Sequence, residues 1–188
     1  MSKSSLTLKI ERDLLTYYRF SKSYLICNEV TLKYGICDLF AIKRSTSKIF
    51  DNKYMTYEFE IKISKSDFQN ELRSKNKTKK HKYYSSGASA QNKPNYFYFV
   101  TTSELKDFAI DFVSKLNKKY GLIVYDESNS ESYKCFSIVS NANRLCKTGN
   151  CDMRLIWNLL SRSTSAYCNL IETIRENPEL LEERLWTM

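Results

Sequence analysis

The stretch YEFEIKIS, residues 57–64, alternates strictly between apolar and polar positions. Its odd-numbered positions, from Tyr57 to Ile63, are apolar, and its even-numbered positions, from Glu58 to Ser64, are polar. Side chains of a β-strand alternate between two faces, so this pattern predicts a strand with one face in a core. The other face then carries two carboxylates and an ammonium group in succession. That face is either a solvated surface or a functional site.

The composition of the chain indicates one folded domain with a strongly basic surface. It has 188 residues, 42% of them apolar, and only two prolines and four glycines, which excludes a disordered protein. Thirty Lys and Arg residues against 21 Asp and Glu give a net charge of +9. A small basic domain is drawn to polyanions, so we expect a nucleic-acid partner. The alternative is a basic surface that only keeps the protein soluble.

The sequence indicates a cytoplasmic protein with reduced cysteines. Residues 1–15 contain no continuous apolar segment of the signal-peptide kind. No stretch reaches the roughly 20 apolar residues that span a membrane. The six cysteines are irregularly spaced and include no Cys-x-x-Cys pair, so we interpret them as core or incidental thiols. A zinc site that includes Cys146 and Cys151 is the less favoured alternative.

The hydrophobic pattern predicts a mixed α/β sheet with helical cover. The predicted elements are a helix over 5–20, strands over 23–30, 34–44 and 54–64, a helix from 65, a strand over 96–102, a helix over 103–120, and strands over 121–127 and 133–142. The pattern changes after residue 144, where two or more helices follow. We therefore divide the chain into a core, residues 1–145, and a helical C-terminal extension, residues 146–188, packed on or beside it.

Asp38 lies inside the apolar stretch ICDLFAI of the second predicted strand. A lone carboxylate there costs several kcal/mol unless it is compensated; the alternative is a strand end that faces water. If strands 34–44 and 54–64 form an antiparallel hairpin whose turn centres on Ile49, Asp38 falls directly opposite Glu60. Directly opposite residues share a face, with Cβ atoms about 5 Å apart.

Two facing carboxylates repel each other, and a divalent cation such as Mg²⁺, which prefers hard oxygen ligands, removes the conflict. Lys62 points to the same face as Glu60. An ammonium group there can orient or deprotonate a metal-bound water, or stabilise charge on a pentavalent phosphorus. The polar face of residues 57–64 is therefore interpreted as half of a metal-dependent phosphodiesterase site.

The pattern CDLFAI…YEFEIKISKSDF resembles the PD-(D/E)XK nuclease superfamily, with Asp38 as its strand acid and Glu60-Ile61-Lys62 as its (D/E)-x-Lys motif. The segments SKSDF, HKYY, NYFYFVTT and YGLIVYDE are similar in order to the MmcB-like DNA-repair branch. The resemblance covers about residues 5–145. It implies a restriction-endonuclease-like αβββαβ core around a mixed sheet.

The resemblance also implies roles for individual residues. Asp38, Glu60 and the backbone carbonyl of Ile61 would hold Mg²⁺ or Mn²⁺, and Lys62 would act on the attacking water. Glu11 corresponds loosely to an acid that some members add from the first helix, and Glu29 is the other candidate for that role. For Glu11 the alternative is an exposed helix residue. Glu58 is interpreted as a rim residue or as solvated.

A basic segment follows the motif, with six Lys or Arg residues between positions 73 and 82. We expect a group of basic and aromatic side chains to contact the nucleic-acid backbone, and a solvated helix end is the alternative. The members of this group are Lys65, Lys79, Lys80, Lys82, Tyr83 and Tyr84. Contacts of this kind position a substrate without reading its sequence.

The function predicted from these observations is a Mg²⁺- or Mn²⁺-dependent deoxyribonuclease that acts in DNA repair, recombination or processing. The alternative is a catalytically weak or inactive nucleic-acid-binding module of the same fold. A third hypothesis is a protein-interaction role of the helical tail, with Trp157 and Trp186. DNA is the expected partner and no membrane is expected; RNA as a substrate and a homodimer stay open.

Overall fold

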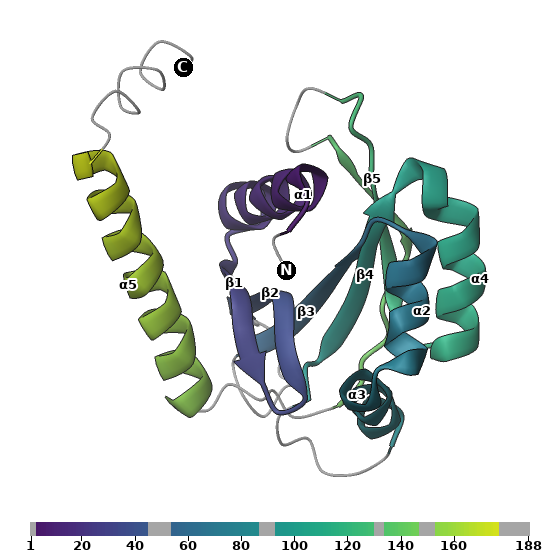
Figure 1. Ribbon diagram of the computed structural model, residues 1–188. Helices are drawn as coiled ribbons and strands as arrows, with labels where there is room; N and C mark the ends of the chain where they lie inside the picture. Colours follow the sequence, from purple (N-terminus) through teal and green to yellow (C-terminus); the bar gives the residue numbers. More distant parts are fainter. Residues whose placement is uncertain (1–2, 45–53, 87–92, 130–133, 147–152, 177–188) are drawn as a thin grey trace. The chain divides into compact units, whose positions relative to one another are not determined.

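The predicted mixed sheet forms, and it has six strands in the residues that the computed structural model describes, which are 3–44, 54–86, 93–129, 134–146 and 153–176. The strands are β1 (Leu25–Leu32), β2 (Gly35–Arg44), β3 (Tyr54–Lys62), β4 (Tyr96–Thr102), β5 (Gly121–Tyr125) and β6 (Phe136–Ser140). They lie in the sheet in chain order (Figure 1). β1, β2 and β3 form an antiparallel meander, β3, β4 and β5 are parallel, and β6 is antiparallel to β5.

Helices cover both faces of this sheet. They are α1 (Ser5–Thr16), which continues as a π-helical turn (Tyr17–Ser21), α2 (Lys65–Arg73), α3 (Lys75–Ser85), and α4 (Lys106–Leu116), which follows a 3-10 turn (Ser103–Leu105). Figure 1 shows α1 on one face and α2 and α4 on the other. The mixed α/β architecture predicted from the sequence is therefore confirmed, and the predicted order of elements holds except around α3.

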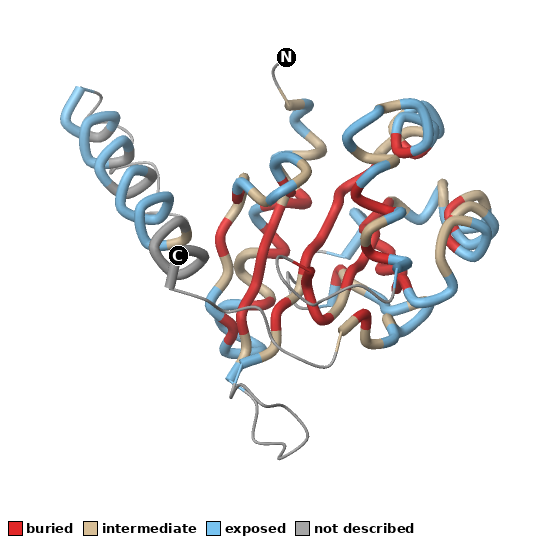
Figure 2. Tube along the Cα trace, turned by 90° about the horizontal axis from the view of Figure 1, so that it is seen from below, coloured by how far each residue is buried: buried red, intermediate tan, exposed pale blue. Residues whose placement is uncertain are grey.

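Two hydrophobic clusters follow from the two-residue period of the strands. On the α1 face, Phe59 of β3 packs in one cluster with Ile10 and Leu14 of α1. On the opposite face, Phe99 of β4 packs with Phe68 of α2, with ring centroids 5.6 Å apart. Figure 2 shows the buried residues concentrated along the strands, with exposed residues on the outer sides of the helices.

The connection from β3 to β4 differs from the prediction, because it contains two helices instead of one. The first helix begins after residue 64, as predicted, with Ser64 as its N-cap, and the Ser64 Oγ accepts the backbone N–H of Asp67 at 3.1 Å. The chain turns at Ser74, whose backbone is extended, and α3 then begins at Lys75. Most of the basic segment between residues 73 and 82 therefore lies in a separate helix, α3, and Lys80 of this helix contacts carboxylates of β3.

The chain divides into two compact units, residues 1–151 and 152–188. The second unit contains α5 (Met153–Glu176), one continuous helix across much of the region in which the sequence predicted two or more helices. The predicted packing of this extension on the core stays a prediction, and Trp186 lies outside the described residues. No helix in the described ranges is long and apolar enough to cross a lipid bilayer.

Candidate functional site: a buried charge network on β3

The antiparallel pairing of β2 with β3 follows the predicted register. Leu39 pairs with Phe59 and Phe40 with Glu58, so the next position along this register sets Asp38 opposite Glu60. The regular pairing ends at Leu39 and Phe59. Beyond it, Oδ2 of Asp38 accepts the backbone N–H of Ile61 at 2.7 Å. The Asp38 carboxylate is thus fixed beside the Glu-Ile-Lys motif, as the sequence predicted.

The polar face of β3 is buried, and it is not a solvated surface. Glu58, Glu60 and Lys62 are 0%, 2% and 4% exposed. Glu60 Oε2 accepts from Lys62 Nζ at 3.0 Å, and its Oε1 accepts from Lys80 Nζ at 2.6 Å. Charges at this depth persist only when they are paired and hydrogen-bonded, and here β3 and α3 supply each other's partners.

The predicted rim or solvated position of Glu58 is wrong. The Lys80 ammonium reaches its Oε1 at 3.1 Å, and the Tyr84 hydroxyl donates to its Oε2 at 2.6 Å. Lys80 and Tyr84 are four residues apart and therefore lie on the same face of α3. That face is turned toward β3, and this contact explains why a carboxylate outside the motif is buried.

The roles predicted for Lys80 and Tyr84 as surface contacts to nucleic acid need correction for the same reason. They are only 6% and 2% exposed. Lys65, Lys79 and Lys82 are exposed, and Tyr83 is half-buried. The predicted group thus separates into two sets. Lys80 and Tyr84 bind the carboxylates of β3, and the other members remain at least partly accessible at the surface.

Glu71 of α2 is a member of the network that the sequence did not reveal. It is fully buried, and its Oε1 lies 2.9 Å from Lys62 Nζ and 2.5 Å from Lys77 Nζ. On its other side, Glu71 Oε2 lies 2.9 Å from Nε2 of His81, whose Nδ1 lies 2.8 Å from the Tyr120 hydroxyl. Lys62 is therefore held between two carboxylates, Glu60 and Glu71, from different elements.

The proton positions around His81 follow from its partners. A carboxylate can only accept, so Nε2 carries a proton and donates it to Glu71. Burial lowers the pKa of His81, although the Glu71 carboxylate opposes this shift. A neutral ring then accepts the Tyr120 hydroxyl at Nδ1. This arrangement fixes the Glu71 carboxylate against Lys62.

The carboxylates of the site differ in their affinity for protons. Burial opposes ionisation of Glu60, but the ammonium groups of Lys80 and Lys62 outweigh it and lower the pKa to about 2. Burial and, after it, the negative charge of Glu60 raise the pKa of Asp38 to about 6, against the opposing charge of Lys62. Burial also raises the pKa of Glu58, despite the nearby ammonium of Lys80. The pKa of Lys62 is raised because Glu60 and Glu71 outweigh its burial.

Glu11 and Glu29, the two candidate supporting acids, both form ion pairs with the ammonium group of Lys3. Glu11 is buried, which contradicts the alternative of an exposed helix residue, and its carboxylate accepts from Lys3 Nζ at 2.8 and 2.9 Å. Glu29 lies 3.1 Å from the same Nζ. It has a positive φ of 51° and lies between the paired residues Asn28 and Val30, at the position opposite Asp38. The Lys3 charge also lowers the pKa of Asp38, so both acids border the predicted site.

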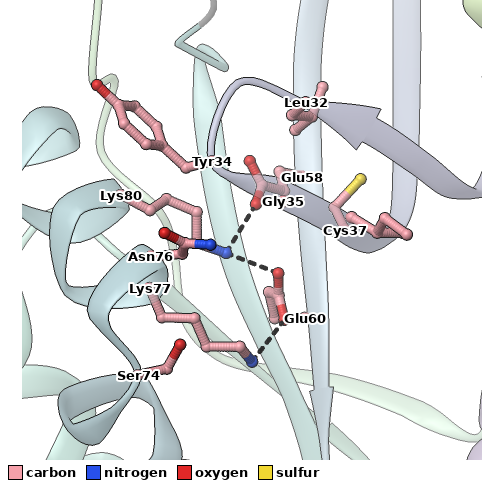
Figure 3. Close-up of a pocket in the computed structure, with 11 residues that line it drawn as sticks. Leu32, Tyr34, Gly35, Cys37, Glu58, Glu60, Ser74, Asn76, Lys77 and Lys80 are labelled. Carbon is pink, nitrogen blue, oxygen red and sulfur yellow. Dashed lines mark hydrogen bonds and ion pairs between the residues drawn. The ribbon is translucent and has the colours of Figure 1, made fainter.

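A pocket of about 210 Å³ opens onto this network. Figure 3 shows Glu58 and Glu60 on one side of it and Lys77 and Lys80 of α3 on the other. Tyr34, in the turn between β1 and β2, also lines the pocket. A small anionic group that enters the pocket would meet the ammonium groups of Lys77 and Lys80 on one wall. The carboxylates of Glu58 and Glu60 form the other wall, and Lys80 pairs with both of them.

The donor set fits a hard divalent cation in its chemistry. Asp38 and Glu60 supply carboxylate oxygens. Burial is the main cause of the raised pKa of Asp38, and repulsion from Glu60, which a cation between the two carboxylates would relieve, is the second. Within the described ranges, no three or more His, Cys, Asp or Glu side chains are grouped closely enough to hold a metal ion. Metal ligation by Asp38, Glu60 and the Ile61 carbonyl therefore stays a prediction. Cys151 lies outside the described residues.

Comparison with known proteins adds information about the fold but not about the function. No protein-family model and no curated protein matches the chain. A solved structure of a protein of unknown function from Silicibacter pomeroyi is similar, with a TM-score of 0.51 and 14% sequence identity over 90% of each chain. At that identity the likeness supports a shared mixed α/β fold and carries no information on activity.

Proposed function

We propose that this protein is a Mg²⁺- or Mn²⁺-dependent nuclease with a restriction-endonuclease-like core formed by α1, β1, β2, β3, α2 and β4. The observation that carries the proposal is the placement of Asp38 opposite Glu60 on adjacent strands, with the ammonium of Lys62 buried beside Glu60. Asp38, Glu60 and the Ile61 carbonyl are the proposed ligands. DNA is the proposed substrate, and DNA repair or processing the proposed context.

Each residue of the network has a distinct task in this proposal. A bound cation would supply Lewis acidity and a water of lowered pKa. Lys62 stabilises negative charge that develops on the phosphodiester, and its orientation is set by Glu60 and Glu71. Lys77 lines the pocket with a partly exposed side chain and is placed to contact an entering phosphate. Lys80 neutralises Glu58 and Glu60 from α3.

A second candidate function is supported by one observation. Both oxygens of Glu60 already accept hydrogen bonds from ammonium groups, one from Lys62 and one from Lys80. A network neutralised in this way is stable without a metal. It therefore also suits a nucleic-acid-binding module that does not cleave.

The deciding experiment is a cleavage assay with the full chain on end-labelled single-stranded, duplex and branched DNA and on RNA, with Mg²⁺, Mn²⁺ or EDTA. We expect metal-dependent cleavage that Asp38→Asn abolishes. Asp111→Asn is the matched control, because Asp111 is an exposed α4 residue whose partner is the neighbouring Lys115. If the wild type binds these substrates but cleaves none of them, the proposal of a nuclease falls and that of a nucleic-acid-binding module takes its place.

A further inference from the structure

A cluster of two tyrosines and two lysines lies next to the pocket. The rings of Tyr34, from the β1–β2 turn, and Tyr83, from α3, have centroids 5.4 Å apart and are tilted by 51°. Lys33 Nζ lies 5.3 Å from the centroid of Tyr34 and 5.1 Å from that of Tyr83. Lys93 Nζ lies 5.0 Å from the Tyr83 centroid. Two segments about 50 residues apart in the chain thus bring aromatic and cationic groups to one place.

The members of this cluster differ in how firmly they are held. Lys93 is 1% exposed, and its ammonium donates to the carbonyl of Ser86 at 2.7 Å, so it supports Tyr83 from a fixed position. Lys33 is exposed, and both tyrosines are half-buried. Tyr34 belongs to the pocket wall, together with Glu60 and Lys80. The cluster therefore offers partly accessible aromatic rings beside the pocket, with a cation at the surface.

The dimensions of the pocket restrict what can reach the carboxylates. Glu58 and Glu60 are at most 2% exposed, and the pocket has about 210 Å³, below the roughly 300–1,000 Å³ of sites that enclose a drug-sized ligand. That volume suits a single phosphodiester with part of its sugar. In a duplex the base faces are stacked on one another, and extruding one base costs a few kcal/mol. A single strand presents its base faces without that cost.

We propose that the substrate is a single-stranded nucleic acid, with an unpaired base stacked on Tyr34 and Tyr83 while the adjoining phosphodiester enters the pocket. Lys33 then moves from the aromatic rings to the backbone phosphate. Base stacking on aromatic side chains tolerates any sequence, because every base has a π-face. This inference rests on the proposed function for its use in catalysis, but its binding part can be tested separately.

The test is fluorescence anisotropy in EDTA, which prevents metal-dependent cleavage, with labelled single-stranded DNA, single-stranded RNA and blunt duplex DNA. Tyr34→Ala and Tyr83→Ala should each weaken single-strand binding by about 5- to 150-fold, the range for loss of one stacked base. Tyr34→Phe should restore it. Duplex affinity should stay within about twofold. Tyr54→Ala, which alters an exposed tyrosine at the start of β3, is the matched control.

Three results would overturn the inference. They are tighter binding of duplex than of either single strand by the wild type, equal losses on duplex and single strands in the tyrosine variants, and unchanged single-strand affinity in those variants. Tyr34→Leu keeps apolar bulk without the ring. It therefore decides the matter if Tyr34→Ala does not fold, and it should bind single strands as weakly as predicted for Tyr34→Ala.

Failure of this inference can be distinguished from failure of the proposed nuclease. If the wild type cleaves duplex DNA with Mg²⁺ and the tyrosine variants cleave equally well, the nuclease stands and the single-strand inference falls. If no substrate is cleaved but the tyrosine variants lose single-strand binding selectively, the inference stands and the catalytic proposal falls. The DNA and RNA arms show which single strand is preferred.

Discussion

The carboxylate of Asp38 accepts the backbone N–H of Ile61 at 2.7 Å, so a side chain joins β2 to β3 where their regular pairing ends. A backbone carbonyl would usually hold this N–H in an antiparallel pair. Because the acceptor here is the Asp38 carboxylate, this carboxylate lies close to the negative charge of Glu60. Burial and that charge together raise the pKa of Asp38 to about 6. The consequence is a measurable dependence of stability on pH.

Asp38 should make the metal-free protein less stable as the pH rises from about 4 to above 6. Its pKa in the folded state is higher than the roughly 3.9 of an unfolded chain, so in that interval the folded state binds more protons and loses stability as they leave. Asp38→Asn should remove this loss, because the amide oxygen can still accept the Ile61 N–H. Thermal melts in EDTA should agree at pH 4. At pH 7.5 the variant should be more stable by about 3 kcal/mol, because each unit of pKa shift is worth about 1.4 kcal/mol, and this corresponds to roughly 6–12 °C.

The same variant should respond differently to metal. Mn²⁺ should raise the melting temperature of the wild type, and titration calorimetry should detect its binding, because a ligand that binds only the folded state stabilises it. Asp38→Asn should show neither effect. Asp111→Asn should behave as wild type. Undiminished Mn²⁺ affinity in Asp38→Asn would remove Asp38 from the proposed ligand set.

Replacing Lys62 should affect both turnover and stability. Lys62→Ala should cut at least about 100-fold more slowly, because an electrostatic contact to the transition state is lost. It should also lose about 3 kcal/mol of metal-free stability, because Glu60 and Glu71 lose a buried partner. Added Mn²⁺ should restore part of that stability.

Lys77→Ala is the control for the stability of this variant. The Lys77 side chain also contacts Glu71, but it is 34% exposed. Lys77→Ala should cost less stability than Lys62→Ala in urea unfolding. Equal turnover by Lys62→Ala and wild type would keep the nuclease but remove the assigned role of this lysine.

Tyr84 should contribute to stability through one hydroxyl group. Tyr84→Phe removes the donor 2.6 Å from Glu58, a carboxylate that is 0% exposed. Leaving a buried acceptor short of a partner costs about 1–3 kcal/mol, which urea unfolding would detect. Tyr83→Phe alters the neighbouring, half-buried tyrosine and should have little effect. Equal stability of the two variants would mean that the ammonium group of Lys80 alone is enough to stabilise the buried Glu58 carboxylate.

The exposed lysines should control the salt dependence of binding. Lys65, Lys79 and Lys82 are exposed and leave the buried network intact when replaced. The triple Ala variant should bind single-stranded DNA more weakly, with a logarithmic salt slope shallower by about 2 if each lysine contacts one phosphate. Lys118→Ala, at an exposed position after α4, is the control. An unchanged slope would place the contact surface elsewhere.

The sequence was sufficient for features that depend on local periodicity. The alternation over residues 57–64 located β3 and its two faces, and the near-symmetric spacing of the apolar strands about Ile49 set the register of Asp38 against Glu60. The serines at 64 and 66, both good N-cap residues before a helical pattern, marked the start of α2, and Ser64 is the one that caps it. Each of these signals lies within a single strand, hairpin or helix end, where few conformations compete.

The inward face of α3 could not be predicted in the same way. Lysine is almost never fully buried unless paired, and the partners that bury Lys80 are two strand carboxylates at least 20 residues away in the chain. The spacing of Lys77, Lys80 and Tyr84 was a usable signal, since residues at i, i+3 and i+7 share one helical face. Glu71 gave no signal, because its partners come from β3 and α3.

The buried network also determines how this protein should respond to ionic strength. Its three carboxylates, Glu58, Glu60 and Glu71, are matched by the ammonium groups of Lys62, Lys77 and Lys80. The formal charges of these six side chains therefore cancel, and the net charge of +9 is carried by the rest of the chain. Mobile ions screen exposed charges far more than buried pairs. Raising the salt concentration should weaken attraction to polyanions while the interior that shapes the pocket keeps its geometry.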